Sequence, residues 1–405
     1  MTDIFKSTYG RGIRLPKAET KTDYFRRLAR ERRHDRKQAP LSVETLLAAY
    51  DLLVQNGNAR RIPCYVAKHV VANVLKSIRS GNYSPQKPIK KLIPKSKGGF
   101  RTISKPSLPD KIVSKAVLEL INDEVNAGLS EQCFGTRKNG GVDACIAAAC
   151  HAIAKGHHFA GSADLKQAFD SVRTELLIAD VKGMVQDTKL LELIAVIIRG
   201  HKGLSRKQGI DQGNNLSSLG LDCHLHQTLD RHFPAGSEDY SYFRYCDNIF
   251  IFGPSKSRVE ELLARAVELA KAVQLVLLVD PVVDLFEHKS TILGYTLQIS
   301  GGKIEIALDQ ERFWSELQIG LMTNHETANP CTGVTQIIDG IWNHLALRTD
   351  WLEAETQKLN HLLNESGYDL RVDHQQTIER LEDLRQKWIR SFKLHDLLKG
   401  YQAGS

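Results

Sequence analysis

In the stretch YFRYCDNIFIF, residues 242–252, two adjacent polar residues, Asp247 and Asn248, lie between two mainly apolar and aromatic runs. Tyr, Phe and Ile favour strands, and two short strands joined by a polar tip are typical of a hairpin. Asp and Asn tolerate turn geometry, so we expect both residues at the tip. A hairpin this apolar needs a large core around it, and a chain of 405 residues, 42% of them hydrophobic, can supply one.

A second acid occupies a similar position earlier in the chain. The segment HHFAGSADL, residues 157–165, predicts a strand with Asp164 at its carboxyl end, leading into a helix that starts near Ser171. Neighbouring strands of one sheet would bring Asp164 and Asp247 close together, and two close carboxylates need a cation between them. Oxygen ligands suit Mg²⁺, and a pair of such ions can promote phosphoryl transfer. The alternative is that each Asp only caps or turns the chain.

The remaining sequence predicts the order helices, basic hairpin, mixed α/β centre and helical tail. The expected elements are two helices within 41–80, a hairpin within 84–106, helices over 110–128 and 141–156, further helices to about 200, a glycine-punctuated loop from 209 running into a helix, a helix over 257–273, strands to about 308 and helices from 310 onward.

Positive charge gathers at the N-terminus. Residues 1–40 carry twelve Lys or Arg against five acids, a net charge of +7 out of +8 for the whole chain. The run FRRLARERRHDRK favours contact with a polyanion, most commonly nucleic acid. A solvated basic helix with internal ion pairs is the alternative.

The cysteine and hydropathy patterns indicate the cellular compartment in which we expect the chain. Seven Cys are scattered without a C-x-x-C pair, which indicates a reduced, cytoplasmic chain without structural zinc. The longest apolar run, AVQLVLLV, is too short to span a bilayer, and we expect no signal peptide and no membrane partner.

Six motifs in order resemble the reverse transcriptase family, most closely its bacterial branch that includes group II intron enzymes. The resemblance runs from about residue 75 to 297, and its motifs are the basic fingers segment NYSPQKPIKKLIPKSKGGFRTISKPSLPDKIVSKAV, the loop CFGTRKNGG, motif A as ADLKQAFDSV, motif B as GIDQGNNLSSL, motif C as RYCDNIFIF and the element KSTILGYTL.

The resemblance implies an α+β, right-hand polymerase fold with fingers, a palm built on an antiparallel sheet, and an α-helical thumb or C-terminal extension. The domains expected from it are a basic N-terminal extension over 1–40, fingers over 41–160 with the basic hairpin at 84–106, a palm over 161–308 and a helical thumb over 309–405.

The resemblance also implies the roles of individual residues. Asp164 and Asp247 would be catalytic and would hold two Mg²⁺ ions together with Leu165. The residues expected to bind the incoming nucleotide are Lys95, Arg101, Phe169, Gln212 and Gly213, with Phe169 lying against the sugar 2′ position and favouring deoxynucleotides. Those expected to contact nucleic acid are Lys111, Arg137, Asp211, Tyr245 and Asn248.

Three departures from the family pattern stand out. Asn248 replaces the second acid of motif C, which lies off the metal axis and does not by itself imply a dead enzyme. Asp211 replaces the usual Pro of motif B; its carboxylate could accept from a base, or it could cap the following helix. Motif D lacks its Lys at the expected place, and only His288 or Lys289 could substitute.

The drifted motifs and helical extension most resemble bacterial defence-associated reverse transcriptases, because neither retron signatures nor a recognisable maturase segment is present. The resemblance implies an RNA template or structured noncoding RNA, deoxynucleoside triphosphates and a DNA product, with a second reverse transcriptase subunit or a homo-oligomer as open alternatives. Three functions stay open: an active DNA polymerase, an RNA-binding scaffold that has lost chemistry, and an RNA polymerase. Asp164 and Asp247 favour the first over the second, and Phe169 favours it over the third.

Overall fold

The structure is a computed structural model. It describes residues 41–95, 98–137, 140–202, 204, 206–324, 337, 338, 340, 342, 353–394 and 398. The predicted basic extension, residues 1–40, lies outside this part of the chain, and so does Lys97 of the predicted hairpin.

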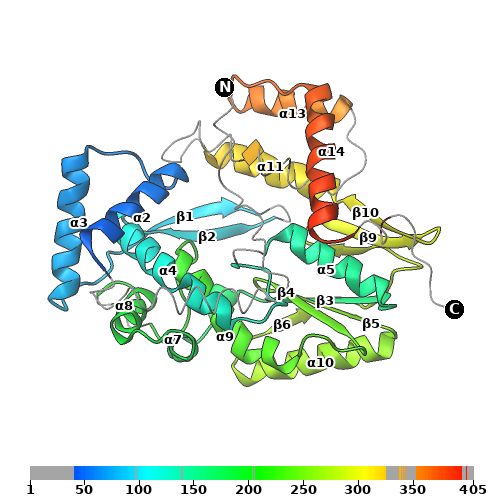
Figure 1. The fold of residues 1–405 in the computed structure, drawn as a ribbon, viewed down its shortest axis with the longest axis horizontal. Coiled ribbons are helices and arrows are strands. Elements are labelled where there is room, and N and C mark those ends of the chain that lie inside the picture. The colour runs from blue at the N-terminus through cyan, green and yellow to red at the C-terminus, as the bar shows by residue number, and fades with distance from the viewer. Residues whose placement is uncertain are drawn as a thin grey trace.

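Three helices and one hairpin form the fingers (Figure 1). The helices are α2 (Val43–Gln55), α3 (Cys64–Arg79) and α4 (Leu108–Gly128), and the hairpin pairs β1 (Ile89–Pro94) with β2 (Phe100–Lys105). Helix α2 begins where the sequence indicates, because the Ser42 side chain accepts from the Thr45 amide at 3.2 Å. The hairpin lies within the predicted range 84–106 and forms a two-stranded sheet of its own.

The palm is built on a five-stranded antiparallel sheet. Strands follow the order β4–β5–β3–β6, and β7 also pairs with β3. Their bounds are β3 (Phe159–Leu165), β4 (Ser241–Tyr245), β5 (Asn248–Gly253), β6 (Leu277–Val279) and β7 (Val283–Asp284). The two acid-bearing strands expected from the sequence are therefore neighbours, since β3 pairs with β5 along its length. The expected boundary between fingers and palm at residue 160 falls inside β3.

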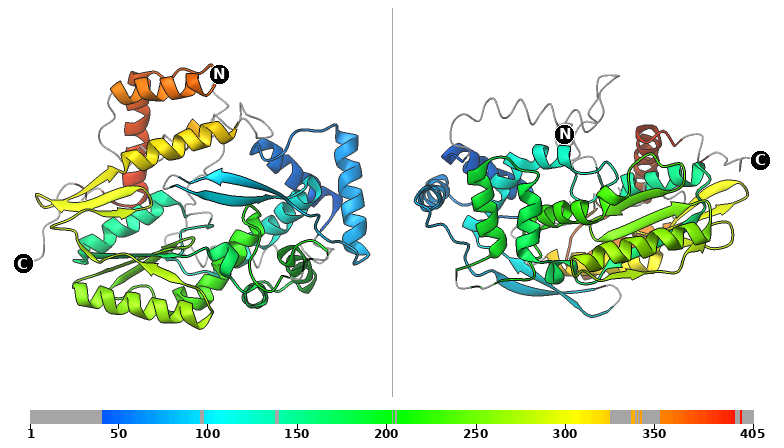
Figure 2. Two further views of the ribbon diagram at one scale, coloured as in Figure 1. Left: turned by 180° about the vertical axis from the view of Figure 1, so that it is seen from behind. Right: turned by 90° about the horizontal axis from the view of Figure 1, so that it is seen from below.

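Each face of this sheet packs into a different core. On one face Ala163, Leu165 and Ile249 join a core shared with the fingers helices and with α10 (Lys256–Ala272). The other face sends Phe243, Phe250 and Phe252 toward α5 (Val142–Ala154) and a three-stranded sheet. That second sheet consists of β8 (Ser290–Ile292), β9 (Tyr295–Ser300) and β10 (Lys303–Leu308). The right panel of Figure 2, a view from below, shows α10 lying along the palm sheet.

The helices between β3 and β4 complete the shared core. They are α6 (Ala168–Ser171), α7 (Thr174–Lys182), α8 (Thr188–Arg199), α9 (Asn215–Thr228) and the short 3₁₀ helix η1 (Asp230–His232). A helix starting near Ser171 was the wrong expectation: α6 ends at Ser171, and α7 begins only at Thr174.

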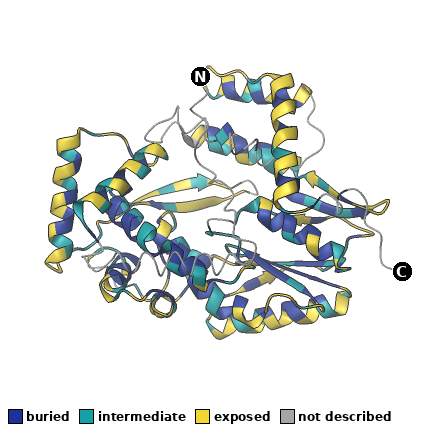
Figure 3. Ribbon diagram, viewed as in Figure 1, coloured by how far each residue is buried: buried dark blue, intermediate teal, exposed yellow. Residues whose placement is uncertain are grey.

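A helical region forms the thumb beyond the second sheet. Helices α11 (Gln310–Asn324), α13 (Glu353–Glu365) and α14 (His374–Ser391) share a separate core that includes Trp314, Leu359 and Leu381. The end of α14 rests on α5, because the Trp388 indole donates to the Asp143 carbonyl at 3.1 Å. Exposed side chains cover the outer faces of α13 and α14 (Figure 3).

The expected α+β fold, with an antiparallel palm sheet and a helical thumb, is confirmed. No helix within the described residues is long and apolar enough to cross a membrane.

Candidate active site

One row of side chains crosses the palm sheet at the end of β3. Asp164 lies directly opposite Asn248 of β5 on one side and Leu278 of β6 on the other, and Asn248 lies opposite Tyr245 of β4. Residues directly opposite each other project to the same face of a sheet. Asp164 therefore has Asn248 and Tyr245 on one side and the half-exposed Leu278 on the other.

Asp247 stands at the end of this row, in the turn between β4 and β5. The turn consists of Cys246 and Asp247, because Tyr245 and Asn248 already pair as strand residues. The prediction of Asn248 at the tip was therefore wrong by one residue. The Leu165 amide donates to the Asp247 carbonyl at 3.2 Å, which ties the turn to the end of β3. Asp164 and Asp247 are thus brought to the same edge of the sheet.

The two carboxylates differ in environment. Asp164 is exposed, whereas Asp247 is partly buried, and this burial raises its pKa above the usual value. A backbone hydrogen bond and the positive charge of Arg101 act in the opposite direction, and the negative charge of Asp222 adds to the rise. The effect of Arg101 shows that a side chain of the fingers hairpin lies close enough to influence the palm carboxylate electrostatically.

This donor set fits a hard divalent cation. Asp164 and Asp247 stand at the same edge of the sheet beside the Leu165 backbone, and oxygen ligands of this kind suit Mg²⁺, which keeps waters and takes substrate phosphates as further ligands. Nowhere in the described part of the chain do three or more His, Cys, Asp or Glu gather as a ready-made cage. Asp164 and Asp247 would therefore hold the ion, and Asn248 donates to Asp247 Oδ1 at 3.4 Å instead of adding a third charge.

The motif B loop is fastened to the fingers hairpin. The Ser104 amide of β2 donates to the Gln212 carbonyl at 2.7 Å. Gly213 has φ +111°, and a Cβ there would lie 2.7 Å from the Ser104 carbonyl oxygen. Glycine is therefore required at this close approach of two backbones.

Asp211 takes part in the same junction. Its Oδ1 accepts from the Ser104 hydroxyl at 3.1 Å and from Arg206 Nη2 at 2.9 Å. The alternative role of capping the next helix is wrong, because the Asn214 side chain caps α9 by accepting from the Leu216 amide at 3.0 Å. Contact between Asp211 and a base stays a prediction, and one of its oxygens is already used within the protein.

Phe169 lies in α6, five residues beyond Asp164. Its carbonyl accepts from the Ile210 amide at 2.7 Å, so the backbone before motif B packs against it. The side chain is half-buried against the shared core. Its expected contact with the sugar stays a prediction.

Three predicted cations have different surroundings. Lys95 is exposed at the tip of the fingers hairpin. Lys111 Nζ donates to the Asn58 carbonyl at 2.9 Å. The pKa of Lys111 is lowered mainly by its burial and, to a smaller extent, by the positive charge of Lys105. Arg137 donates to backbone carbonyls in the last turn of α4 and just beyond it, including those of Asn126 and Ser130. In this arrangement Lys111 and Arg137 fasten the fingers, and the remaining N–H donors of each side chain stay available, so their contact with nucleic acid stays a prediction.

The motif D substitutes do not join the row of side chains through Asp164. His288 and Lys289 are exposed between β7 and β8, and β8 belongs to the second sheet. The neighbour of Asp164 on that side is Leu278, whose side chain is 52% exposed.

Sequence reasoning missed a buried ionic cluster under the motif C turn. Arg244 of β4 pairs with Asp222 of α9 at 2.6 Å and with Asp230 of η1 at 2.9 Å. Burial acts to raise the pKa of Asp230, but Arg244 and hydrogen bonds from His226 and Tyr242 lower it to about 2. The available signal was an Arg in the middle of an aromatic run, where a charge is costly unless it is paired.

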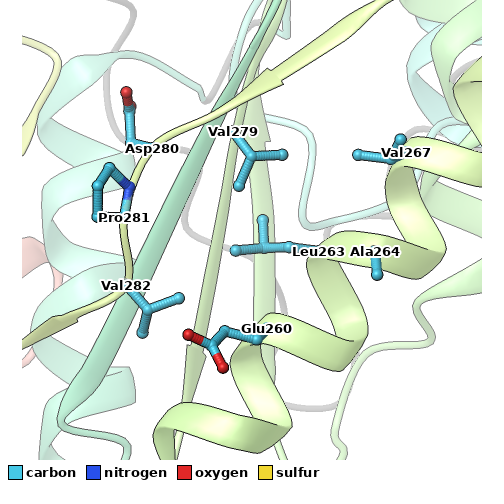
Figure 4. A pocket seen from close by; sticks show the side chains of 8 residues that line it. All are labelled: Glu260, Leu263, Ala264, Val267, Val279, Asp280, Pro281 and Val282. Atoms are coloured by element: carbon cyan, nitrogen blue, oxygen red, sulfur yellow. The ribbon is translucent and has the colours of Figure 1, made fainter.

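A pocket of about 440 Å³ lies elsewhere on the palm (Figure 4). It is bounded by Glu260, Leu263 and Val267 of α10 and by the segment 279–282. None of the predicted site residues lines it, so we do not associate it with the reaction.

Comparison with known proteins gives distant relatives. The chain is 23% identical over 261 residues to a COX1/OXI3 intron 1 protein of Saccharomyces cerevisiae, covering 63% of this chain and 29% of that protein. It is 29% identical over 149 residues to Protein YkfC of Escherichia coli, covering 35% of this chain and 39% of YkfC. The chain thus spans less than two-fifths of the length of either relative.

Similar solved structures are telomerases. Apo telomerase from Candida tropicalis is 13% identical with a TM-score of 0.46, covering 82% of this chain and 68% of that one. Telomerase from Candida albicans, in complex with a fragment of telomeric RNA, is 12% identical with a TM-score of 0.44, covering 82% of this chain and 64% of that one.

The family comparison covers the region that holds the site. The family model described as reverse transcriptase (RNA-dependent DNA polymerase) matches residues 93–297. This range is half of the chain, and it includes the fingers hairpin from Ile93, the row through Asp164 and the turn at Asp247. The chain belongs to the reverse transcriptase family.

Proposed function

We propose that this protein is an RNA-directed DNA polymerase that uses two Mg²⁺ ions held by Asp164 and Asp247 to add deoxynucleotides to a growing strand. The observation that carries the proposal is the register of the palm sheet. It sets Asp164 opposite Asn248 and ties the Asp247 turn to Leu165, which supports a site that uses both acids at one edge of the sheet. Membership of the reverse transcriptase family supports the same reaction.

Each group has a distinct task in this reaction. When bound, Mg²⁺ supplies activation of the attacking hydroxyl and stabilisation of the leaving oxygen. Asp164 and Asp247 hold and orient the ions, and the exposed Arg101 of β2 binds the triphosphate with charge-assisted hydrogen bonds. Gln212 and Gly213 form the surface next to the incoming nucleotide. The junction with Ser104 fixes the position of their backbone.

The test of the reaction compares single-charge variants of the same size. Asp164→Asn and Asp247→Asn should each lower incorporation of dTTP on poly(rA)·oligo(dT) by at least ~100-fold, because each removes a charged ligand from a shared site. Glu268→Gln on α10 is the matched control, since it also neutralises one acid but is 70% exposed and belongs to none of the strands that form the row through Asp164. Near-parental incorporation by both Asp variants would overturn the proposal.

Selection of deoxynucleotides is assigned to Phe169. An aromatic ring against the sugar leaves no room for a 2′-hydroxyl, so Phe169→Val should raise the use of UTP relative to dTTP. The ratio of the two incorporation rates in parent and variant measures this. An unchanged ratio would make Phe169 a packing residue only, which its half-buried position against the core also allows.

A role in bacterial antiviral defence, in the cytoplasm and with a structured noncoding RNA or a partner subunit, is the finer part of the proposal. Its support is the drift of motifs B and C, with Asp211 and Asn248 at the altered positions. Sequencing the nucleic acid that copurifies with the protein, with and without added deoxynucleotides, tests it. Bacteria that express the parent but not Asp164→Asn should resist phage infection; equal phage yields in both strains would contradict the defence role.

One observation favours a second function, an RNA-binding scaffold without chemistry. The predicted metal site has two acids, Asp164 and Asp247, and the described residues contain no group of three metal-ligating side chains. A scaffold would bind RNA equally well as the parent and as Asp164→Asn, and neither would incorporate nucleotides. The incorporation assay therefore separates the two functions.

A further inference from the structure

A fully buried arginine lies directly under the turn that carries Asp247. Arg244 is 0% exposed and occupies β4 between Phe243 and Tyr245. Because side chains alternate along a strand, Arg244 projects to the face of the sheet opposite to Tyr245 and the row through Asp164. It reaches no substrate from there, so it can affect the reaction only through its charge, which lowers the pKa of Asp247, and through the groups that it contacts.

The guanidinium group joins two acids to the turn. Its Nε and Nη2 donate to the two oxygens of Asp230, both at 2.9 Å. Its Nη1 donates to Asp222 Oδ1 at 2.6 Å and to the Cys246 carbonyl at 2.7 Å. A single nitrogen therefore connects a carboxylate of α9 with the backbone of the motif C turn.

The loop at 133–136 supports the turn from another side. The Phe134 amide donates to the Arg244 carbonyl at 2.8 Å, and the Thr136 amide donates to Asp222 Oδ2 at 3.2 Å. A Cβ on Gly135 would lie 2.7 Å from the Cys246 amide nitrogen, so the loop backbone is packed directly against the turn.

The contact with the Cys246 carbonyl fixes the peptide that leads into Asp247. A peptide unit is planar, so the Cys246 carbonyl and the Asp247 amide share one plane and rotate together. Cys246 has φ +53°, in a region that side-chain-bearing residues occupy only when their surroundings hold them there. Arg244 and the Gly135 backbone supply that restraint.

We propose that Arg244 is a positioning residue for the metal site, which sets the direction of the Asp247 carboxylate by holding the Cys246 carbonyl. The inference rests on the proposed function in one respect, that Asp164 and Asp247 hold a divalent cation. Asp222 and Asp230 serve in turn to orient the guanidinium, and they couple α9, which follows the motif B loop, to the motif C turn.

The competing interpretation is that the cluster only stabilises the fold. Buried ion clusters can be replaced as a whole by uncharged residues of similar size without loss of folding, whereas removing one charge leaves the others unpaired. The triple variant Arg244→Met, Asp222→Asn, Asp230→Asn therefore removes the hydrogen bond to Cys246 while leaving no unpaired buried charge. Circular dichroism and thermal unfolding would show whether the triple variant folds.

Metal affinity is the readout that a purely structural role would not move in a folded variant, and Arg244→Lys, which keeps every charge of the cluster, separates positioning from the coulombic effect of Arg244 and Asp222 on Asp247. Mn²⁺ titrated into the protein and followed by electron paramagnetic resonance reports binding without any reaction. We expect the triple variant to bind Mn²⁺ about tenfold more weakly, within the range seen when groups that orient metal ligands are removed. The KM for dTTP should change little while kcat falls. Parental Mn²⁺ affinity in the folded triple variant would overturn the proposal.

A conservative variant decides the question if the triple variant does not fold. Arg244→Lys keeps the positive charge but has no planar fork, so one ammonium group cannot serve both Asp230 and the Cys246 carbonyl. A weaker Mn²⁺ affinity in the folded Lys variant supports the proposal, and parental affinity overturns it. Tyr83→Phe is the control, because it removes a 2.9 Å hydrogen bond to the buried Asp110 in the fingers and should leave Mn²⁺ affinity unchanged.

One further measurement separates this inference from the proposed function. If Asp247→Asn binds Mn²⁺ as tightly as the parent, no metal is held at the turn and both proposals fail. If Asp247→Asn loses Mn²⁺ but the Arg244 variants do not, only the positioning role of Arg244 fails.

Discussion

Two antiparallel hairpins of similar length each carry residues proposed for function, and their surroundings are opposite. The fingers hairpin β1–β2 is largely exposed, with Ser104 as its buried member. The palm hairpin β4–β5 is buried along almost all of its length. Figure 3 shows this contrast between the two pairs of strands.

The sequences of the two hairpins explain the contrast. IKKLIP and FRTISK mix basic and polar residues with apolar ones, whereas YFRY and NIFIFG are almost continuously apolar. Continuous apolar runs indicate strands covered on both faces. Among the described residues the fingers hairpin has no other strand beside it, while the palm hairpin pairs with β3 in the middle of a sheet.

The two hairpins hold their charged residues in different ways. Asp247 sits in a two-residue turn, held by the core under it and by Arg244. Lys95 sits in a longer loop at the free end of the fingers hairpin, which is joined to the palm mainly through Ser104. The turn that carries Asp247 is therefore restrained on several sides, whereas the cations of the fingers hairpin are exposed.

The largest expected difference is in core packing. Ile251 of β5 is 0% exposed, so Ile251→Ala should lower the free energy of unfolding by about 3 kcal/mol through reduced burial and a cavity. Leu92 of β1 is 61% exposed, so Leu92→Ala should change it by less than ~0.5 kcal/mol. Urea unfolding of both variants measures this. Equal decreases would mean that the fingers hairpin is covered in solution and that the comparison fails.

The next effect concerns the joint between the fingers hairpin and the motif B loop. Gly213→Ala places a Cβ 2.7 Å from the Ser104 carbonyl at φ +111° and should cost ~1–3 kcal/mol of local stability. The Ser104 amide, which donates to Gln212, should then exchange its hydrogen faster. Gly99→Ala is the control: it has φ +79° but nothing within 4 Å, so only the backbone preference is changed. Unchanged exchange at Ser104 in Gly213→Ala would show that the joint does not depend on this close approach.

The palm hairpin was predictable from sequence, since its apolar runs and its Asp determine a buried strand pair with an acid near the tip. The row through Asp164 was predictable only as proximity, because register depends on pairing between strands far apart in the chain. The tip itself was misplaced by one residue, because Cys246 adopts a positive φ that its residue type does not favour.

Local sequence patterns could not predict which polar groups interact when they lie far apart in the chain. Arg244 was recognisable as an unusual charge in an aromatic strand, but its partners Asp222 and Asp230 come from α9 and η1. Asp211 was assigned to a base or a helix cap because its partner Ser104 comes from the distant fingers hairpin, and its other partner, Arg206, is brought to it by the fold of the loop before α9.

Asp211 allows a test of the same joint with a smaller effect. Asp211→Asn keeps the shape but weakens the hydrogen bonds from Ser104 and Arg206, and it should cost about 1 kcal/mol at the joint. Hydrogen exchange of the Ser104 amide should rise modestly. An unchanged base composition of products from a mixed-sequence RNA template would limit the role of Asp211 to this joint. A shift confined to one or two bases would instead show that the carboxylate reads a base edge, at roughly 1–3 kcal/mol for each good hydrogen-bonded pair.

The smallest effect expected is on the salt dependence of RNA binding. Lys90 and Arg101 are both exposed on the fingers hairpin. If both bind phosphates, Lys90→Gln with Arg101→Gln should make the plot of log affinity against log salt shallower by roughly 0.7–0.9 for each phosphate that the protein no longer neutralises, because fewer counterions are released. Fluorescence anisotropy with a labelled single-stranded RNA over a range of KCl concentrations gives the slope. Lys256→Gln with Lys271→Gln on α10 is the matched control, because it also removes two exposed positive charges, 61% and 73% exposed, but from the palm. Equal slopes for the two double variants would mean that RNA responds to the overall charge of the protein, and the fingers hairpin would have no special role in binding.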